Sequence, residues 1–326
     1  SMADYQRRFG GYLSERVYGD MRFLPYAVEQ FFNNGGSTCY VMRVCGEAGS
    51  AKGVLVGSDK ENPLVEFSAS NPGAWGNRLQ AKLLSVLKNR MQVTEANREE
   101  MKMTVKDASG YQEGDIACLQ TVATVEVNGK LETSVAFSHH FVKQAESGAV
   151  TLEGSVPESA ENAEFYLYLL EWNVMVGDDT AAEQYEGTSL NPARSNYMEQ
   201  VMDKSQLVTV RVQAEKVKEI GTLLGDAKEP VISITFEGGG DGEVKSSQSE
   251  NAKLYIGEDG SPDQRTGLMA FKTLQDVSIM AIPGITDKSV QSALVSHCEN
   301  AGNRFAVLDM PLDAKEVSAI QEFREN

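Results

Sequence analysis

The stretch that decides how the chain is organised is residues 67–84, FSASNPGAWGNRLQAKLL. Its first half is rich in residues that favour tight turns, and a single tryptophan, Trp75, stands among them. The turn residues are Asn71, Pro72, Gly73, Gly76 and Asn77. The run that follows, up to Leu84, predicts a β-strand. We therefore expect a corner in the chain here, and Trp75 needs a packing partner at that corner.

The bulk composition restricts the classes of function. The chain has 326 residues, which favours at least two domains. Its net charge of −17 argues against a nucleic-acid partner, because binding phosphates requires clustered Lys and Arg. No apolar run approaches the roughly 20 residues of a membrane helix, so we expect no membrane partner. No motif indicates a cofactor.

The four cysteines, Cys39, Cys45, Cys118 and Cys298, form no CxxC pair. So few in so long a chain do not indicate a disulfide framework, which favours an intracellular, reducing compartment. Cys39 and Cys298 lie in apolar runs, so we expect both thiols to be buried.

Both ends of the chain show α/β patterns. Residues 24–45 predict a helix with Pro25 in its first turn, stopped by Gly35 and Gly36, and then a buried strand from Cys39 to Val44. Residues 276–326 predict buried strands at 276–284 and 304–311, each followed by a helix. The first helix ends at Gly302, and the second begins with a capping box formed by Asp313 and Glu316. This order is typical of a βαβ unit with a parallel sheet.

The region between these ends has β patterns instead. Residues 121–137 alternate around Asn128-Gly129, which is typical of a hairpin, and residues 204–214 form another alternating strand. We predict an α/β core domain with a mixed or parallel sheet, made of residues 3–67 and 237–326. A β-rich domain at residues 68–236, forming one unit or two subdomains, is inserted into it. The overall class is α+β.

Motifs that carry chemistry are almost absent. The sequence has no G-x-S-x-G, P-loop or H-E-x-x-H motif, and GGGDG at 238–242 predicts a turn rather than a phosphate cradle. His139 and His140 point opposite ways on a strand and are interpreted as a solvated strand end. His297 lies on the apolar face of its helix, where a hydrogen-bonded core histidine is expected.

The best candidate for an enzyme site is a pair of carboxylates. Asp309 follows a predicted parallel strand, at the end where α/β sheets usually place ligands, and Asp287 begins the helix after the neighbouring strand. Two carboxylates there would suit a divalent metal. The alternative, which we favour, is that Asp287 is a helix-start residue and Asp309 a loop residue. We therefore expect no catalytic residue and no metal.

Several segments occur in an order that points to a known family. They are YQRRFGGYL (5–13), LPYAVEQFFNNGGSTCYVMRV (24–44), NPGAWGNRL (71–79), GGGDG (238–242) followed by DQRTGLMAF (263–271), DVSIMAIPGITD (276–287) and NRFAVLDMP (303–311). The chain resembles the tail sheath proteins of contractile phage tails and related injection particles. The resemblance covers about residues 3–84 and 237–312, and it is loose in the middle.

The resemblance implies a structural role and no catalysis. Sheath subunits form six-membered rings stacked around a tail tube, and contraction drives the tube through a target envelope. It implies other sheath subunits and the tube protein as partners, location in a virion tail, and synthesis in a bacterial host. Family members carry arms at both ends that this sequence lacks, so we expect this chain to be a monomer or a weak oligomer.

In this interpretation, Asn71, Pro72, Gly73, Gly76 and Asn77 form the corner between core and insertion, and Trp75 anchors the interdomain junction. The alternative is that Trp75 fills a local core. Two other functions stay open: an α/β enzyme with a carboxylate metal site, and a β module that binds a surface.

Overall fold

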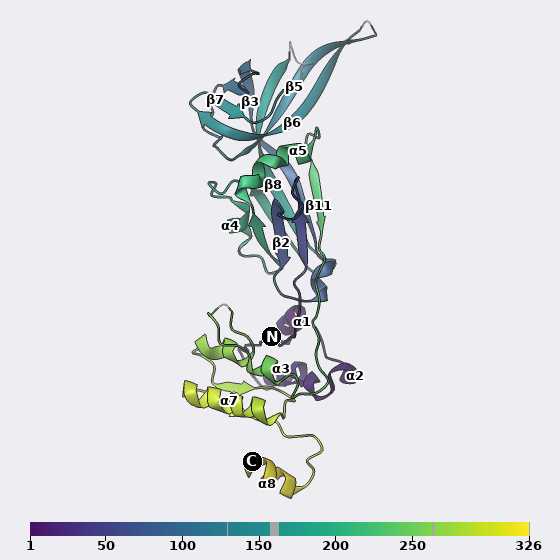
Figure 1. Cartoon of the computed structure of the whole chain (residues 1–326), viewed down its shortest axis with the longest axis vertical. Coiled ribbons are helices and arrows are strands. Elements are labelled where there is room, and N and C mark those ends of the chain that lie inside the picture. The colour runs from purple at the N-terminus through teal and green to yellow at the C-terminus, as the bar shows by residue number, and fades with distance from the viewer. Residues whose placement is uncertain (129, 157–162, 263, 326) are drawn as a thin grey trace. The chain divides into compact units, whose positions relative to one another are not determined.

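The computed structural model describes residues 1–128, 130–156, 163–262 and 264–325, and it combines helices and strands in an α+β arrangement (Figure 1). Contacts between residues divide the chain into two compact units. Unit 1 comprises Ser1–Glu47 and Gly242–Asn326, and unit 2 comprises Ala48–Asp241. Unit 2 thus begins before residue 68, because the strands at 52–55 and 65–69 pair with each other and the second pairs with a strand at 208–212.

Unit 2 is built mainly from antiparallel strands. Its smaller sheet has the order β1-β2-β10, and its larger sheet has the order β11-β3-β4-β7-β6-β5-β8-β9. The strands of the smaller sheet are β1 (Lys52–Leu55), β2 (Val65–Ala69) and β10 (Val208–Val212). Those of the larger sheet are β3 (Gln80–Asn97), β4 (Lys102–Val105), β5 (Ile116–Val127), β6 (Lys130–Glu146), β7 (Ala149–Leu152), β8 (Glu164–Gly177), β9 (Ala182–Thr188) and β11 (Val231–Thr235).

Part of the larger sheet closes on itself. The pairings β3–β4, β4–β7, β7–β6, β6–β5 and β5–β8 are completed by a direct β3–β8 pairing, which makes a six-stranded antiparallel barrel. Apolar side chains from all six strands form one hydrophobic cluster, which includes Met103, Leu119, Val150 and Leu167. Closure removes exposed strand edges, and this lets the barrel bury a core of its own.

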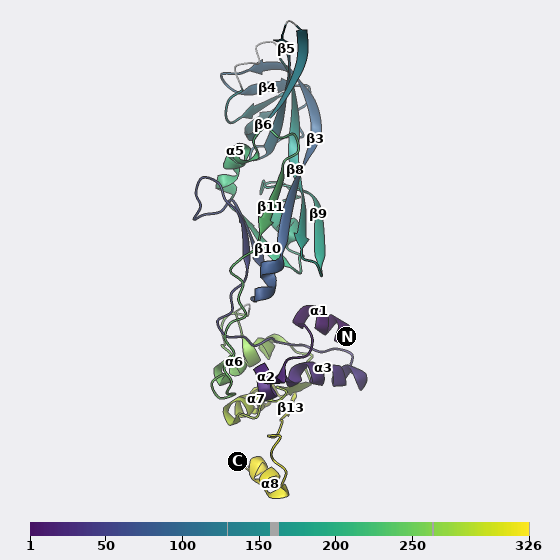
Figure 2. The ribbon, with the colours of Figure 1, turned by 90° about the vertical axis from the view of Figure 1, so that its right-hand side faces the viewer.

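A second and larger cluster fills the other half of unit 2. Trp172 and Val174 of β8 and Ala81 and Leu83 of β3 pack there with Phe67 of β2. Strands β3 and β8 are long enough to contribute to both clusters, and Figure 2 shows them running through both halves. The helical segments of unit 2 include η2 (Ala74–Arg78), α4 (Met198–Met202), η4 (Ala214–Glu219) and α5 (Ile220–Leu224).

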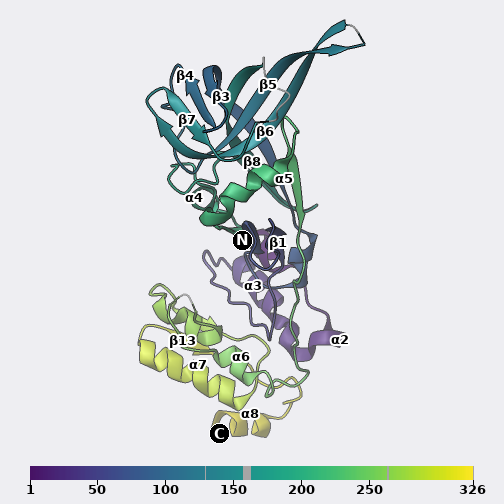
Figure 3. The same ribbon diagram turned by 45° about the horizontal axis from the view of Figure 1, so that its top comes forward.

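Unit 1 has a small βαβ motif. Strands β12 (Ile279–Ala281) and β13 (Phe305–Val307) pair in parallel, and α7 (Lys288–Ala301) connects them (Figure 3). Helix α7 ends at Gly302, whose φ of 71° is the left-handed conformation expected of a C-terminal glycine. The βαβ prediction is therefore confirmed. The other helical segments of unit 1 are α1 (Met2–Phe9), α2 (Glu15–Tyr18), η1 (Gly19–Phe23), α3 (Leu24–Asn33), α6 (Ala252–Ile256), η5 (Gly267–Thr273) and α8 (Val317–Glu325).

Three predictions for unit 1 are wrong. Residues 39–44 form no strand, and Cys39 is exposed, because none of the strands that the structure describes offers this segment a hydrogen-bonding edge. Helix α8 begins at Val317 rather than near Asp313, because the preceding residues form a turn in which the Ala314 N–H donates to the Pro311 carbonyl. Strands β12 and β13 are shorter than predicted, and each exposes one face.

The hairpin predicted at Asn128-Gly129 is confirmed by its strands. Strands β5 and β6 pair up to Val127 opposite Lys130, and Asn128 has a positive φ of 53°. Gly129 itself lies outside the described residues. The strand predicted at 204–214 is present as the shorter β10.

Candidate functional site

The 71–77 turn, defined as Asn71 to Asn77, connects β2 to β3 and contains the start of η2. Gly73 has a φ of 142°, which side-chain-bearing residues rarely adopt, and a Cβ at this position would lie 2.7 Å from Cδ1 of Trp75. Glycine is therefore required at this point both for the backbone conformation and for the room that the indole ring occupies.

Trp75 is half-buried and packs against the larger hydrophobic cluster of unit 2. Its Nε1–H donates to the backbone carbonyl of Asn71 at 3.2 Å, which satisfies the polar end of the ring. The packing partner that Trp75 needs is therefore local: the ring closes the turn and covers the hydrophobic cluster beneath it. The role of Trp75 as an anchor between domains stays a prediction.

The 71–77 turn also binds the two chain segments at which unit 2 begins and ends. The Gly73 N–H donates to the Gly49 carbonyl at 2.9 Å, and the Ala74 N–H donates to Oδ1 of Asp241 at 2.8 Å. Asn77 makes a reciprocal pair with the Gly239 backbone, with both hydrogen bonds at 2.8 Å. The turn therefore holds the entering and the leaving segment of unit 2 in one hydrogen-bonded cluster.

Those two segments are also joined directly. Gly49 and Gly240 exchange backbone hydrogen bonds of 3.0 Å in each direction. Gly76 of the turn packs tightly beside them, since a Cβ there would lie 2.8 Å from Cβ of Ala51 and 2.9 Å from Cβ of Ala69. Pro72, which is partly buried, precedes this contact. The glycines of the stretch thus let the backbone of the turn approach neighbouring side chains closely, which no sequence pattern alone reveals.

The two carboxylates singled out from the sequence both bind backbone amides. Oδ1 of Asp287 accepts from the N–H groups of Ser289 at 3.0 Å and Val290 at 3.2 Å, which caps the N-terminus of α7. These hydrogen bonds, with the Ser289 hydroxyl foremost, lower the pKa of Asp287. Asp309 accepts from the Gly284 N–H through Oδ2. Each of the two carboxylates therefore stabilises the local backbone conformation through these hydrogen bonds.

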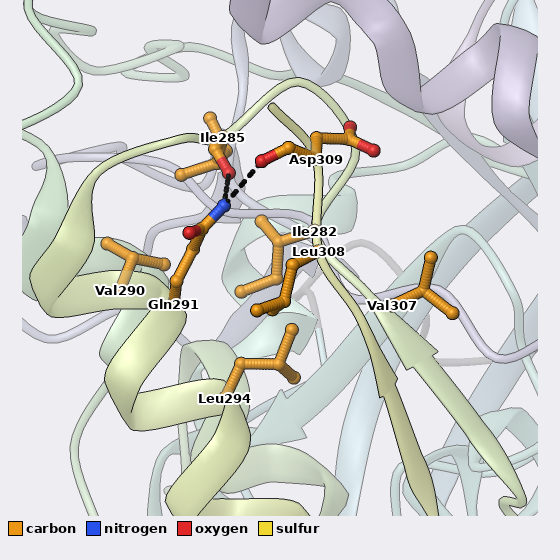
Figure 4. Close-up of a pocket in the computed structure, with 8 residues that line it drawn as sticks. All are labelled: Ile282, Ile285, Val290, Gln291, Leu294, Val307, Leu308 and Asp309. Atoms are coloured by element: carbon orange, nitrogen blue, oxygen red, sulfur yellow. Dashed lines mark hydrogen bonds between the residues drawn. The ribbon is translucent and has the colours of Figure 1, made fainter. Parts of the chain in front are cut away.

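A small pocket that Asp309 lines, and Asp287 does not, lies at the carboxyl ends of β12 and β13 (Figure 4). Its polar centre is Gln291, whose side-chain amide donates to the backbone carbonyls of Ile285 at 3.1 Å and Asp309 at 2.7 Å. Figure 4 shows the Asp309 carboxylate turned away from Gln291. The remaining lining residues are Ile282, Val290, Leu294, Val307 and Leu308. The pocket is mainly apolar, and the Gln291 side-chain amide joins the loop at Ile285 to the loop at Asp309.

The interpretation of His139 and His140 as a solvated strand end is wrong. Both are 6% exposed. Helix α5 packs so closely on His139 that a Cβ on Gly221 would lie 2.4 Å from the His139 carbonyl oxygen, whereas His140 is covered from the Glu153–Gly154 segment, where a Cβ on Gly154 would lie 3.2 Å from its Nδ1. Nδ1 of His139 lies 3.1 Å from the Gly225 carbonyl, and Nδ1 of His140 lies 2.8 Å from the Glu153 carbonyl. Burial lowers the pKa of both rings.

His297 has the role expected of it. It is buried on α7, and its Nε2 lies 2.9 Å from Nη1 of Arg304. Burial and the nearby guanidinium lower its pKa. Within the described part of the chain, no three His, Cys, Asp or Glu side chains are grouped so as to hold a metal ion.

A buried ion pair in unit 2 was not anticipated from the sequence. The side chain of Asp115 is fully buried, and Arg194 donates to it through Nε at 2.9 Å and through Nη2. Asn191 donates to the same carboxylate at 2.9 Å. The partners lie far apart in the sequence, so only the folded sheet brings them together. Arg194 Nη2 also donates to the Gly110 carbonyl at 2.8 Å, so the cluster holds several segments of unit 2 together and acts as a structural support.

Among the residues that the structure describes, none of the helices combines the length and the apolar character that crossing a bilayer requires. Comparisons with models of protein families and with curated proteins returned no match.

Proposed function

We propose that the chain is part of a contractile-tail sheath subunit, a structural protein that polymerises around a tail tube and contracts. The support from the sequence is the order of the segments given above, which is the order found in that family. The proposal requires that one part of the chain form contacts with neighbouring subunits. It also requires that another part be stable without them.

The observation that carries the proposal is the uneven distribution of exposed apolar side chains. Of the large hydrophobic residues that are exposed among the described residues, thirteen lie in unit 1 and six in unit 2, although unit 1 is the shorter. All of the largest fully buried side chains belong to unit 2. Contiguous exposed apolar surface marks interaction sites, and in unit 1 the exposed Ile279 and Phe305 are directly paired across β12 and β13. Unit 1 is therefore the part that we assign to subunit contacts.

We further infer that unit 2 is an insertion into the chain of unit 1, and that it projects from the assembly. Two closed hydrophobic clusters make it stable without partners. It also carries most of the negative charge: its 17 Lys and Arg against 29 Asp and Glu give −12 of the total −17. Like charges repel at close packing, so an outward position suits this unit.

The enzymatic alternative has less support. Asp287 and Asp309 both accept backbone hydrogen bonds, and the Ser289 hydroxyl that donates to Asp287 belongs to the same helix cap. We therefore assign no catalytic residue and no cofactor. A surface-binding role for unit 2 has no specific contact in its favour.

Negative-stain electron microscopy tests the proposal. The chain should be compared with a longer version to which arm segments of a contractile-tail sheath protein have been added at both ends. Tubes or stacked rings from the longer protein, and single particles or small oligomers from this chain, are the expected result. A longer protein that stays monomeric over a wide range of salt and protein concentration would remove the support for a sheath.

A further inference from the structure

One guanidinium joins η5 to α7 within unit 1. Nη1 of Arg304 donates to the backbone carbonyl of Phe271 at 3.0 Å, and Nη2 donates to the carbonyl of Leu274, directly after η5. The same Nη1 lies 2.9 Å from Nε2 of His297 on α7. We call Arg304, His297 and the two carbonyls the arginine clamp, because together they fasten η5 to α7.

The arginine clamp determines the protonation state of His297. A guanidinium has donors and no acceptor, and it stays charged over the whole physiological range of pH. Nε2 of His297 must therefore accept the hydrogen bond from Arg304, and the single proton of the ring must lie on Nδ1. A second proton would occupy the accepting nitrogen and place one cation against another. The closed clamp and a charged His297 therefore exclude each other.

The surroundings of His297 oppose a positive charge on its ring. The residue is only 7% exposed, so water offers the ring little solvation. Burial, together with the two cations Arg304 and Lys272 of η5, lowers the pKa of His297. The strands beside α7 contribute Met280 and Ala306 to the adjoining hydrophobic cluster. The neighbours that η5 and these strands supply are therefore cationic or apolar.

The carboxylates of the adjacent segments have other partners. Asp259, which precedes η5, forms an ion pair with the lysine of η5. Asp276, which follows η5, accepts from the hydroxyl of Tyr40 at 2.7 Å. Glu299 of α7 is exposed. These carboxylates are thus engaged by other side chains or by solvent, whereas two cations oppose a second proton on His297.

The clamp lies beside one of the small hydrophobic clusters of unit 1. Leu268 of η5 is 3% exposed and packs in that cluster with Leu294 and Cys298 of α7. Phe271 and Leu274, whose carbonyls the clamp binds, are partly buried against the same cluster. Opening the clamp would therefore loosen the attachment of η5 to α7 and give solvent access to apolar side chains between them.

We propose that the arginine clamp is a pH-operated latch, which is closed while His297 is neutral and releases η5 from α7 when His297 takes up a proton. The direction follows from linkage. The pKa of His297 is lowered from its usual 6.5 in the closed latch, so the open form binds the proton more readily and gains population as the pH falls below 6.5. The latch does not depend on the sheath function, since it requires only the contacts within unit 1.

Amide hydrogen exchange followed by NMR tests the latch in the whole chain. The Leu274 N–H donates to the Phe271 carbonyl at 3.2 Å, so its protection reports whether the end of η5 is ordered. Opening takes up one proton, so this protection factor should fall several-fold, up to about tenfold, between about pH 7.5 and about pH 5.5. The Gln291 N–H, which donates to the Asp287 carbonyl at 3.0 Å in the first turn of α7, should keep its protection.

His297→Gln is the variant that removes the titration. The glutamine amide oxygen can accept from Arg304 and does not titrate, so the protection factor of Leu274 should be the same at both pH values. His140→Asn is the matched control, because it removes a titratable ring from unit 2. It should leave the pH dependence at Leu274 as it is in the wild-type chain.

The nitrogen chemical shifts of the histidine rings provide a test that needs no variant. They identify which nitrogen carries the proton in a neutral ring. His297 should have its proton on Nδ1 at about pH 7.5, because Nε2 accepts from Arg304. The loss of protection at Leu274 should follow the titration of this ring.

Four results would overturn the proposal. They are a neutral His297 with its proton on Nε2, a ring that titrates while the protection of Leu274 stays constant, a pH dependence that persists in His297→Gln, or an equal loss of protection at Gln291. The last result would indicate unfolding of the whole of unit 1 rather than release of η5. None of the four bears on ring or tube formation by the longer protein, so the two proposals fail independently.

Discussion

Replacing Gly76 by Ala should destabilise unit 2 through one contact. The added Cβ would lie 2.8 Å from Cβ of Ala51 and 2.9 Å from Cβ of Ala69. These neighbours are 0% and 4% exposed and belong to the larger cluster, so neither can move without disturbing the core. Overpacking of this kind costs about 1–3 kcal/mol. Alanine also restricts the unfolded chain, which offsets about 0.4–1 kcal/mol, so we expect a net loss of about 1–2 kcal/mol.

Urea unfolding followed by tryptophan fluorescence measures this loss selectively. The chain has two tryptophans, Trp75 and Trp172, and both lie in unit 2, so the signal reports the unfolding of that unit. With a slope of about 2 kcal/mol per molar urea, the midpoint of Gly76→Ala should fall by about 0.5–1 M.

Gly240→Ala is the matched control for this measurement. Gly240 is in the same neighbourhood as Gly76, but a Cβ there meets no atom within 4 Å, and its φ is not in the left-handed region. We expect a change within about 0.5 kcal/mol. A Gly76→Ala midpoint equal to or above that of the wild type would refute the reasoning. So would an equal fall for Gly240→Ala, because the cost would then not arise from the close approach to Ala51 and Ala69.

Three further predictions concern polar side chains that the fold holds by hydrogen bonds. Asp115→Ala should destabilise unit 2 by about 3 kcal/mol in the same urea assay, since it leaves the Arg194 guanidinium without its buried partner. The pKa of His140 is lowered by burial from its usual 6.5, so the unfolded state binds more protons just below that pH. The stability of unit 2 should therefore fall as the pH is lowered from 7 toward 5, and His140→Asn should make this dependence shallower. Asp287→Ala should cost about 1 kcal/mol at α7, seen as faster amide hydrogen exchange in its first turn, whereas Asp287→Asn should restore most of the protection.

The elements that were predictable from the sequence are those specified by local signals. Helix α7 has a carboxylate at its start and a glycine at its end, and the β5–β6 hairpin has Asn-Gly at its turn, so each was identified from a few adjacent residues. The predicted strand at 39–44 failed because an apolar run specifies burial only when a partner strand is available. In this fold none pairs with it.

The candidate site was predictable only in part. The turn residues between Asn71 and Asn77 predicted a corner. Their hydrogen-bonding partners, Gly49, Gly239 and Asp241, are distant in sequence, and no sequence pattern identifies them. The burial of His139 likewise depends on α5, and that of His140 on the segment at Glu153 and Gly154, and both reach β6 only in the folded unit. Long-range hydrogen bonds between glycine backbones leave no periodic trace in a sequence. They therefore became visible only in the structure.

The difference between the two units bears most directly on function. Unit 2 closes a barrel, buries Trp172 and satisfies its internal ion pair at Asp115, so it has the features of a unit that is stable alone. Unit 1 has small clusters, a parallel pair with one uncovered face, and Phe305 largely in solvent. Burying the apolar surface that unit 1 leaves exposed against a partner would contribute favourable binding free energy. This combination of an acidic unit with closed hydrophobic clusters and a unit with exposed apolar side chains supports the proposal that unit 1 contacts neighbouring subunits and that unit 2 faces solvent.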